Sequence, residues 1–388
     1  MTKSIILAAL WVLLATTGVL AAERDVKLAG NLISNNAGAS IGEFVGSNGS
    51  LDLEAVRRSG YEGALDMEGF EFDIDPATGQ PLLRPSAVTR TVADPDDVYW
   101  DNSISPSLPG MNRTITALTV YDGKLIAGGD FTAAGDVAAN YIASWDGSRW
   151  SPLGSGMDGS VYALTVYDGK LIAGGYFWTA GDVTAHYIGA WDGSSWSALG
   201  SGMDDRVFGL TVYDGKLIAG GDFAEAGGMT ANRIATWDGS SWSPLGSGMN
   251  NWVFFLSVYD GKLIAAGQFE EAGGVEANHI ASWDGSNWSP LGSEMDLAVN
   301  ALTAYDGNLI AGGNFLTAGG MAATRIASWD GSSWLQMGSG MDRAVLALTV
   351  YDGKPVAAGY FTMAGGVTAS RIASWDGSEW SPLGSGMD

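Results

Sequence analysis

Few side chains in this sequence could carry acid–base or metal chemistry, and their spacing does not bring them together. The two histidines, His186 and His279, are far apart in sequence, whereas a metal site needs several ligands that converge on one ion. Paired carboxylates, which glycoside hydrolysis requires, could come from Glu225, Glu270, Glu271 and Glu276. The sequence predicts no cofactor and no enzyme, and a glycoside hydrolase or lyase that uses the region of Glu270 and Glu271 stays open as an alternative.

Tryptophan and arginine offer a different chemistry, the stacking and hydrogen bonding by which a protein holds a ligand. Both residue types are enriched at binding interfaces. Most of the 16 tryptophans belong to a repeated pattern, but Trp178 and Trp252 stand outside it within 111–388. Together with Arg206 and Arg343 they are the predicted ligand-binding residues, and the predicted ligand is a protein or a glycan.

The repeated pattern has a constant length of 46 residues, as from Trp145 to Trp191. Its most conspicuous part is "SWDGSRWSPLGSGM" at 144–157, which returns almost unchanged in each later unit. The first tryptophan of that motif occurs at 145, 191, 237, 283, 329 and 375. Repetition at this length indicates six copies of one supersecondary unit.

Each unit contains four short runs that predict four antiparallel strands. In the first unit these runs are 117–123, 124–131, 141–147 and 148–157, with a looser loop before the third. Asp122-Gly123 between the first two favours a two-residue type I′ hairpin. Four such strands in one unit are typical of a β-propeller blade. Proline recurs in the fourth run, which agrees with its place at the outer edge of the blade.

The number of blades depends on residues 65–110. The run "VYWDNSISPSLPGM" at 98–111 is similar to the third and fourth strands of a unit, and residues 76–79 predict the turn of a hairpin. The fold class is therefore all-β, a propeller of six regular repeats at 111–388 preceded by a degenerate first blade at 65–110. Seven blades are expected, and six blades with a capping segment are the alternative.

A double glycine near the end of the second strand can be compared among the six copies. Its first position is glycine four times and alanine at Ala266 and Ala358, whereas its second position, Gly129 in the first unit, is always glycine. The second glycine should therefore need either a positive φ or a very close approach of another backbone segment.

The two ends of each blade differ in how much they vary. The turns between strands one and two and between strands three and four repeat Tyr-Asp-Gly and Trp-Asp-Gly almost without change. The loops at the opposite end vary, and this end carries Trp178, Trp252, Arg206 and Arg343. We therefore expect the variable end to be the binding face, and the repeated tryptophan motif to be a structural fastener.

Composition and the N-terminus limit the partners and the location. The formal net charge of −24 disfavours nucleic acid, because phosphate binding depends on lysine and arginine. Residues 1–22 have the basic start, apolar stretch and small-residue cleavage site of a signal peptide, which predicts secretion to the periplasm or the extracellular space. No membrane span is expected after cleavage of this peptide. Residues 23–64 then form a segment rich in Gly, Ser and Asn. The protein is expected to be a monomer.

The Gly-Gly after strand two, followed by Trp145 in strand three and Trp150 in strand four, resembles kelch-type propeller repeats. The sequence run "ANYIASWDGS…WSPLGSGM" is also similar to repeats of the fungal cortical cell-polarity marker family and of secreted bacterial proteins. The shorter run "SWDGSRW" loosely resembles the Asp-box of sialidase-type propellers. The resemblance implies a propeller and an interaction role. The predicted function is a secreted, non-enzymatic binding scaffold, with a carbohydrate-binding lectin as a further alternative.

Overall fold

The structure is a computed structural model that describes residues 70–74, 81–85, 110–293 and 295–387. The chain divides into two compact units, one with strands β1 (Phe70–Ile74) and β2 (Pro81–Pro85) and the other with β3 to β38. Strands β1 and β2 pair antiparallel, so the predicted hairpin is confirmed. Across the described residues, no helix has the length and apolarity that a membrane crossing requires.

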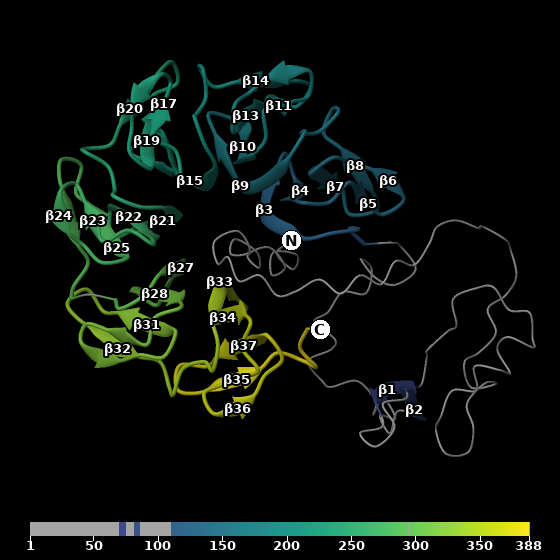
Figure 1. The fold of residues 1–388 in the computed structure, drawn as a ribbon, viewed down its shortest axis with the longest axis vertical. Coiled ribbons are helices and arrows are strands. Elements are labelled where there is room, and N and C mark those ends of the chain that lie inside the picture. The colour runs from purple at the N-terminus through teal and green to yellow at the C-terminus, as the bar shows by residue number, and fades with distance from the viewer. Residues whose placement is uncertain (1–69, 75–80, 86–109, 294, 388) are drawn as a thin grey trace, which may run out of the picture. The chain divides into compact units, whose positions relative to one another are not determined.

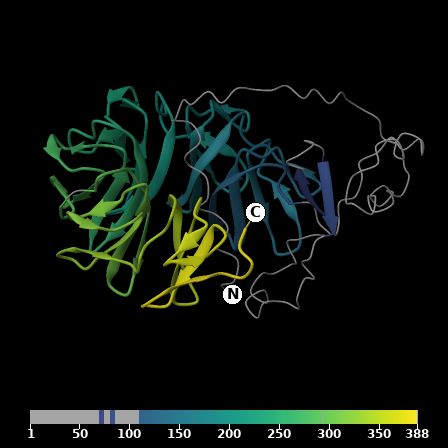
Figure 2. The ribbon, with the colours of Figure 1, turned by 60° about the horizontal axis from the view of Figure 1, so that its bottom comes forward.

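Between β3 and β38, 24 strands form six four-stranded antiparallel sheets, here blades 1 to 6, in a propeller ring. Figures 1 and 2 show the blades in chain order around a common axis, with the first strand of each blade innermost. The innermost strands are β3 (Ile115–Tyr121), β9 (Ser160–Tyr167), β15 (Val207–Tyr213), β21 (Val253–Tyr259), β27 (Val299–Tyr305) and β33 (Val345–Tyr351). The predicted fold class is confirmed.

The remaining strands of each blade follow outward in chain order. The second strands are β4 (Lys124–Gly129), β10 (Lys170–Tyr176), β16 (Lys216–Gly221), β22 (Lys262–Gly267), β28 (Asn308–Gly313) and β34 (Lys354–Gly359). The third strands are β7 (Ile142–Trp145), β13 (Ile188–Trp191), β19 (Ile234–Trp237), β25 (Ile280–Trp283), β31 (Ile326–Trp329) and β37 (Ile372–Trp375). The outermost strands are β8 (Trp150–Pro152), β14 (Trp196–Ala198), β20 (Trp242–Pro244), β26 (Trp288–Pro290), β32 (Trp334–Gln336) and β38 (Trp380–Pro382).

The loop between the second and third strands was expected to be loose, and the structure shows a small hairpin there instead. Its strands are β5 and β6 (Ala133–Ala134, Val137–Ala138), β11 and β12 (Thr179–Ala180, Val183–Thr184), β17 and β18 (Glu225–Ala226, Met229–Thr230), β23 and β24 (Glu271–Ala272, Val275–Glu276), β29 and β30 (Thr317–Ala318, Met321–Ala322), and β35 and β36 (Met363–Ala364, Val367–Thr368). Each hairpin is also bridged to the methionine that precedes its blade, as Ala180 is to Met157. Each of these strands has only two residues, which is too short a run to be recognised in the sequence.

The local turn and glycine predictions can be checked directly. Asp122 and Gly123 have φ values of 49° and 71°, which is the type I′ geometry predicted. Gly129 lies outside the positive-φ region, but a Cβ at that position would lie 2.1 Å from the Thr114 carbonyl oxygen. Close approach of another backbone segment, rather than positive φ, therefore explains why the second glycine never varies.

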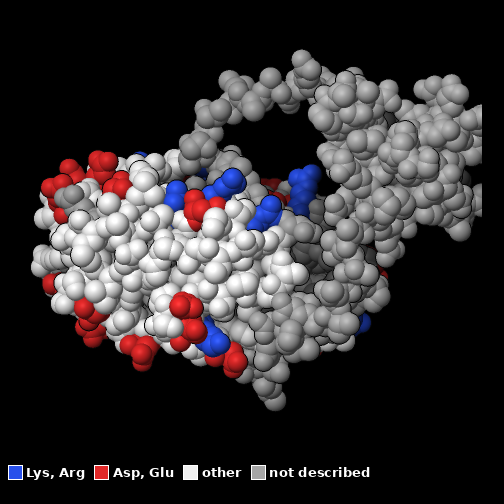
Figure 3. Space-filling view, turned by 90° about the horizontal axis from the view of Figure 1, so that it is seen from below, with Lys and Arg blue, Asp and Glu red and all other residues white. Residues whose placement is uncertain are grey.

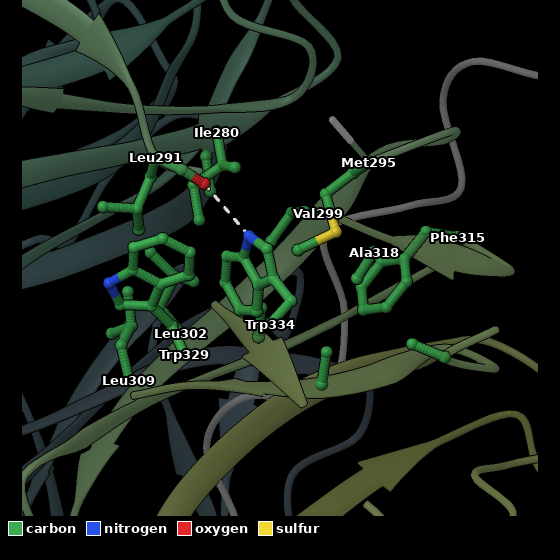
Figure 4. Packing of buried hydrophobic residues seen from close by; sticks show 14 of the residues in the cluster. Ile280, Leu291, Met295, Val299, Leu302, Leu309, Phe315, Ala318, Trp329 and Trp334 are labelled. Atoms are coloured by element: carbon green, nitrogen blue, oxygen red, sulfur yellow. Dashed lines mark hydrogen bonds between the residues drawn. The ribbon is translucent and has the colours of Figure 1, made fainter. Parts of the chain in front are cut away.

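Neighbouring blades are joined by the repeated tryptophans. In blade 5, Trp334 Nε1 donates a hydrogen bond of 3.0 Å to the carbonyl oxygen of Leu291 at the end of blade 4, and Trp329 packs beside it (Figure 4). The same bond, at 2.8–3.1 Å, joins Trp196 to Leu153, Trp242 to Leu199, Trp288 to Leu245 and Trp380 to Met337. Each of these five junctions buries side chains from both blades in a single cluster.

The aspartate of the tryptophan motif is also structural. Asp146 Oδ1 accepts hydrogen bonds from the backbone N–H groups of Ser148 and Arg149 and from the Ser148 hydroxyl. These donors lower the pKa of Asp146 to about 2, and the Ser148 hydroxyl contributes most. The equivalent aspartates of the other five blades accept the same backbone bonds. The motif closes a turn and locks blades together, as the fastener interpretation requires.

The described residues form six blades, and a seventh is not shown among them. Most of the predicted first blade at 65–110 lies outside the described residues, apart from β1, β2 and Gly110. Within the described part, the facing surfaces of blade 6 and blade 1 belong to separate apolar clusters rather than to one mixed cluster. The expectation of seven blades therefore stays a prediction.

Charged side chains have a simple distribution on the side of the propeller that Figure 3 shows. Acidic and basic groups gather along the upper and lower rims of that view, and the wall between the rims is largely uncharged. Because the propeller axis runs vertically in Figure 3, the rims are the two ends of the blades. On the side shown, the charged side chains therefore lie mainly at the ends of the blades and not on the wall.

Candidate functional site

The site is built on one end of the propeller, which we call the loop face. It consists of the small hairpin of each blade and the connection that leads into that blade's innermost strand. Asp158, in such a connection, accepts hydrogen bonds at Oδ1 from the backbone N–H groups of Trp178 (2.8 Å) and Thr179 (2.9 Å) in the hairpin. The residues that hold the hairpins this way are Asn112, Asp158, Asp204, Asn250, Asp296 and Asp342. The first residue of each variable loop is therefore structural, which the sequence interpretation missed.

Arg206 is the centre of an aromatic cluster that exists only once in the described propeller. Its guanidinium carbon lies 5.9 Å from the ring centre of Tyr176, 5.7 Å from that of Phe208 and 5.9 Å from that of Trp252. These residues come from blades 2, 3 and 4, so the cluster spans two junctions. The structure thus brings together two predicted site residues, Arg206 and Trp252, that are 46 positions apart.

Two carboxylates form ion pairs with the Arg206 guanidinium. Its Nη2 donates to Asp222 Oδ2 at 3.0 Å, and its Nε lies 3.4 Å from Asp205 Oδ1. Burial raises the pKa of Asp222, and the neighbouring Asp205 charge adds to this, against the opposing effects of a Trp252 hydrogen bond and of Arg206. Because one cation faces two carboxylates, the cluster is not suited to an anionic ligand.

Trp178 extends the same surface outward on blade 2. Its side chain is 55% exposed, and the neighbouring Tyr176 is 52% exposed. The Trp178 ring lies 5.0 Å from that of His186 and 6.0 Å from that of Tyr187, and Tyr187 is 6.1 Å from Tyr176. Since Tyr176 contacts Arg206, ring contacts link three of the four predicted residues through Tyr176 and the buried Tyr187, and we call this group the aromatic ledge (Trp178, Tyr187, Tyr176, Arg206 and Trp252).

Arg343, the fourth predicted residue, is placed differently. It is exposed on blade 6, at the start of that blade, and no contact with the aromatic ledge is found among the described residues. Within the repeat it aligns with Asp205 rather than with Arg206, because three repeat lengths of 46 residues separate positions 205 and 343. An arginine at another position of the variable loop was therefore too weak a signal.

The acidic and histidine candidates do not form a reaction centre among the described residues. Glu271 pairs with Glu276 across a small hairpin on blade 4, and both are exposed. His279 is buried, and burial lowers its pKa, while His186 stacks at the edge of Trp178 on another blade. Within the described part of the chain, no group of three or more His, Cys, Asp or Glu side chains could hold a metal ion.

The sequence interpretation did not find several members of the cluster. Phe208 and Tyr162, whose rings are 5.8 Å apart, lie in innermost strands, and Phe254 is 5.9 Å from Phe208. The signal for them was available, because the equivalent position is threonine in β3, asparagine in β27 and leucine in β33. The predicted binding residues come from the loops alone, whereas this variation lies within an innermost strand.

No protein-family model and no curated protein matches the chain. Among solved structures, it is similar to the computationally designed Ika8 protein, with 18% identity, a TM-score of 0.45 and coverage of 70% of this chain and 74% of that one. It is similar to the WD40 repeats of RRP9, with 13% identity, a TM-score of 0.47 and coverage of 69% and 78%. The WD40 β-propeller domain of Doa1 gives 13% identity, a TM-score of 0.40 and coverage of 64% and 91%.

Proposed function

We propose that the protein is a non-enzymatic binding scaffold whose contact surface is the aromatic ledge on the loop face. The observation that carries this proposal is that Trp178, Arg206 and Trp252, from three neighbouring blades, lie on one surface that the other blades do not repeat. Exposed aromatic residues beside a partly buried arginine are the groups that dominate binding energy at protein interfaces. The ligand is a neutral or cationic segment of a protein, because two carboxylates accompany Arg206.

A carbohydrate ligand is the second candidate, supported by the exposure of Trp178 and Tyr176 on the same blade. Flat, exposed rings give a sugar ring an apolar surface on which to stack, and the charge of the cluster favours a neutral glycan. The kelch-like character of the repeats and secretion through residues 1–22 belong to the same proposal, supported by the sequence motifs. N-terminal sequencing of the exported protein should begin at residue 22 or 23.

The test is a screen of the full chain against a peptide display library and an array of neutral glycans, followed by variants of the ledge. Trp178→Ala and Trp252→Ala should each weaken the selected ligand about tenfold or more, because truncating an aromatic hot spot typically has this effect. The matched control is Leu316→Ala, which changes the exposed residue at the position of Trp178 in blade 5. If both tryptophan variants bind every selected ligand as the wild type does, the loop-face proposal is wrong.

A further inference from the structure

The connection that leaves blade 4 differs from the others at one residue. Directly before the repeated methionine, the chain has glycine at 110, 156, 202, 248, 340 and 386, but Glu294 in this connection. A Cβ added to Gly248 would lie 2.2 Å from the Asn232 carbonyl oxygen, and the φ of Gly248 is 78°. A residue with a side chain does not fit this arrangement, so Glu294 requires the two segments to lie further apart at the junction of blades 4 and 5.

The neighbouring residues that the structure describes show this separation. In blade 3, Asn232 Nδ2 donates to the Ser247 carbonyl oxygen at 3.1 Å and holds the connection against the blade. Asn278, the equivalent residue of blade 4, makes no such bond to Ser293 among the described residues, and its Nδ2 lies 3.5 Å from Glu276 Oε1. The hydrogen bond that joins blade and connection is therefore missing here.

The segment that follows β26 also lies closer to blade 5 than its equivalents lie to their next blades. A Cβ added to Gly292 would be 2.4 Å from the ring of Trp329 in blade 5. The equivalent distance is 3.3 Å at Gly200 and 3.1 Å at Gly246. Together with the missing asparagine bond, this shift shows that the connection has moved toward blade 5 and away from the end of blade 4.

A cavity of about 380 Å³, which we call the junction pocket, opens at this place beside the small hairpins of blades 4 and 5. Ile280, Pro290 and Leu291 give it an apolar wall, and Glu276 and Asp296 add carboxylates. Lysine, arginine and histidine are absent from the described residues that line it. An apolar wall with two carboxylates and no basic side chain favours a ligand that is both apolar and cationic.

The two carboxylates can accept further hydrogen bonds. Asp296 Oδ1 accepts the backbone N–H groups of Leu316 and Thr317, and Asp296 Oδ2 has no partner among the described residues. Glu276 is exposed and lies opposite Glu271 across the hairpin of β23 and β24. Like charges at directly opposite positions of a hairpin are destabilising, so a bound cation would also relieve this repulsion.

We propose that the junction pocket binds a small organic cation, a primary amine on an apolar body, whose ammonium group donates to the carboxylates of Glu276 and Asp296. An apolar cavity of about 150 Å³ is enough to hold benzene, so the junction pocket has room for one ring and an aminomethyl group. The formal net charge of −24 adds a long-range attraction for cations. The pocket shares no lining residue with the aromatic ledge, so this inference does not depend on the function proposed for the ledge.

The experiment compares two probes of similar size, benzylamine and benzyl alcohol, by calorimetric titration of the full chain at pH 7. Benzylamine is a cation at this pH, so it should bind the wild type about fivefold or more tightly than the neutral alcohol. Asp296→Asn removes one carboxylate and keeps the hairpin bonds, because Asn250 accepts the equivalent two bonds in blade 4. This variant should weaken benzylamine about threefold to fivefold and change benzyl alcohol by less than about twofold.

Glu294→Gly restores the residue of the other units and should abolish benzylamine binding, because the connection can then close against Asn278 as it does in blade 3. Trp178→Ala should leave benzylamine binding unchanged, so a failure of the ledge and a failure of the pocket give different results. Absence of benzylamine binding to the wild type at millimolar concentration would overturn the proposal. Unchanged binding in Glu294→Gly, or equal affinity for the amine and the alcohol, would overturn it as well.

Discussion

The repeated tryptophans and Trp178 of the loop face have the same chemistry but opposite surroundings. Trp242 is 2% exposed and donates its indole N–H to the Leu199 carbonyl oxygen, as its counterparts do at the other junctions. Trp178 is largely exposed, and its ring contacts His186 and Tyr187 within its own blade. The comparison teaches that in a repeat protein, the frequent aromatic residue holds the ring together, and the rare one is available to a partner.

The same contrast applies to the acidic residues. The aspartates of the tryptophan motif accept local backbone hydrogen bonds in every blade, whereas Asp222 lies beside Arg206 in a single blade. Identical blades can only offer identical contacts, so a specific site requires residues that break the repeat. Three predictions test this contrast, beginning with the largest effect.

Trp242→Ala should lower the free energy of unfolding by about 3–5 kcal/mol, because it leaves a cavity between two blades and removes a buried hydrogen bond. Trp178→Ala should lower it by less than about 1 kcal/mol, because the ring is mostly exposed. Urea unfolding followed by circular dichroism measures both. Equal losses for the two variants would show that the loop-face tryptophan is also a fastener.

Asp204→Ala should lower the free energy of unfolding by about 1–2 kcal/mol, because Oδ1 accepts the backbone N–H groups of Ala224 and Glu225 at 2.8 Å. Asp204→Asn should be nearly neutral, because Asn250 accepts the equivalent two bonds in blade 4. Thermal unfolding of the two variants measures the difference. If the asparagine variant loses as much as the alanine variant, the charge rather than the hydrogen bonds matters at this position.

The pKa values of the carboxyl groups in the two regions should be shifted in opposite directions from the ordinary value. Backbone and hydroxyl donors lower the pKa of Asp330 from 3.8 to about 2, so its stabilising effect is complete above the ordinary value and is lost as the pH falls through about 2. The pKa of Asp222 is raised, so its contribution to stability increases as the pH falls through that raised value. Carbon-detected NMR titration of the aspartates measures both, and an Asp330 pKa at or above 3.8 would contradict the fastener role.

Much of the fold could be predicted because the signals were local and repeated. The Asp122-Gly123 turn, the edge prolines and the strand order of each blade depend on residues close in sequence, and the six copies confirmed one another. The small hairpin at 133–138 was missed, because its strands have only two residues each and because Asn112 and Met111, which hold it, lie outside the loop itself. For the site, the loop comparison identified three members of the ledge and overlooked Tyr176 and the axial rings.

The sequence by itself determined the blade, the ring of similar blades and the role of the tryptophan motif, because a fixed period and strong turn residues leave few alternatives. Only the tertiary structure decided which of the irregular residues meet. Arg206 and Trp252 lie in different units, and their contact depends on how neighbouring blades turn their ends toward the axis. Arg343 has the same residue type, but it aligns with Asp205 within the repeat and lies exposed on blade 6, without a contact to the ledge among the described residues.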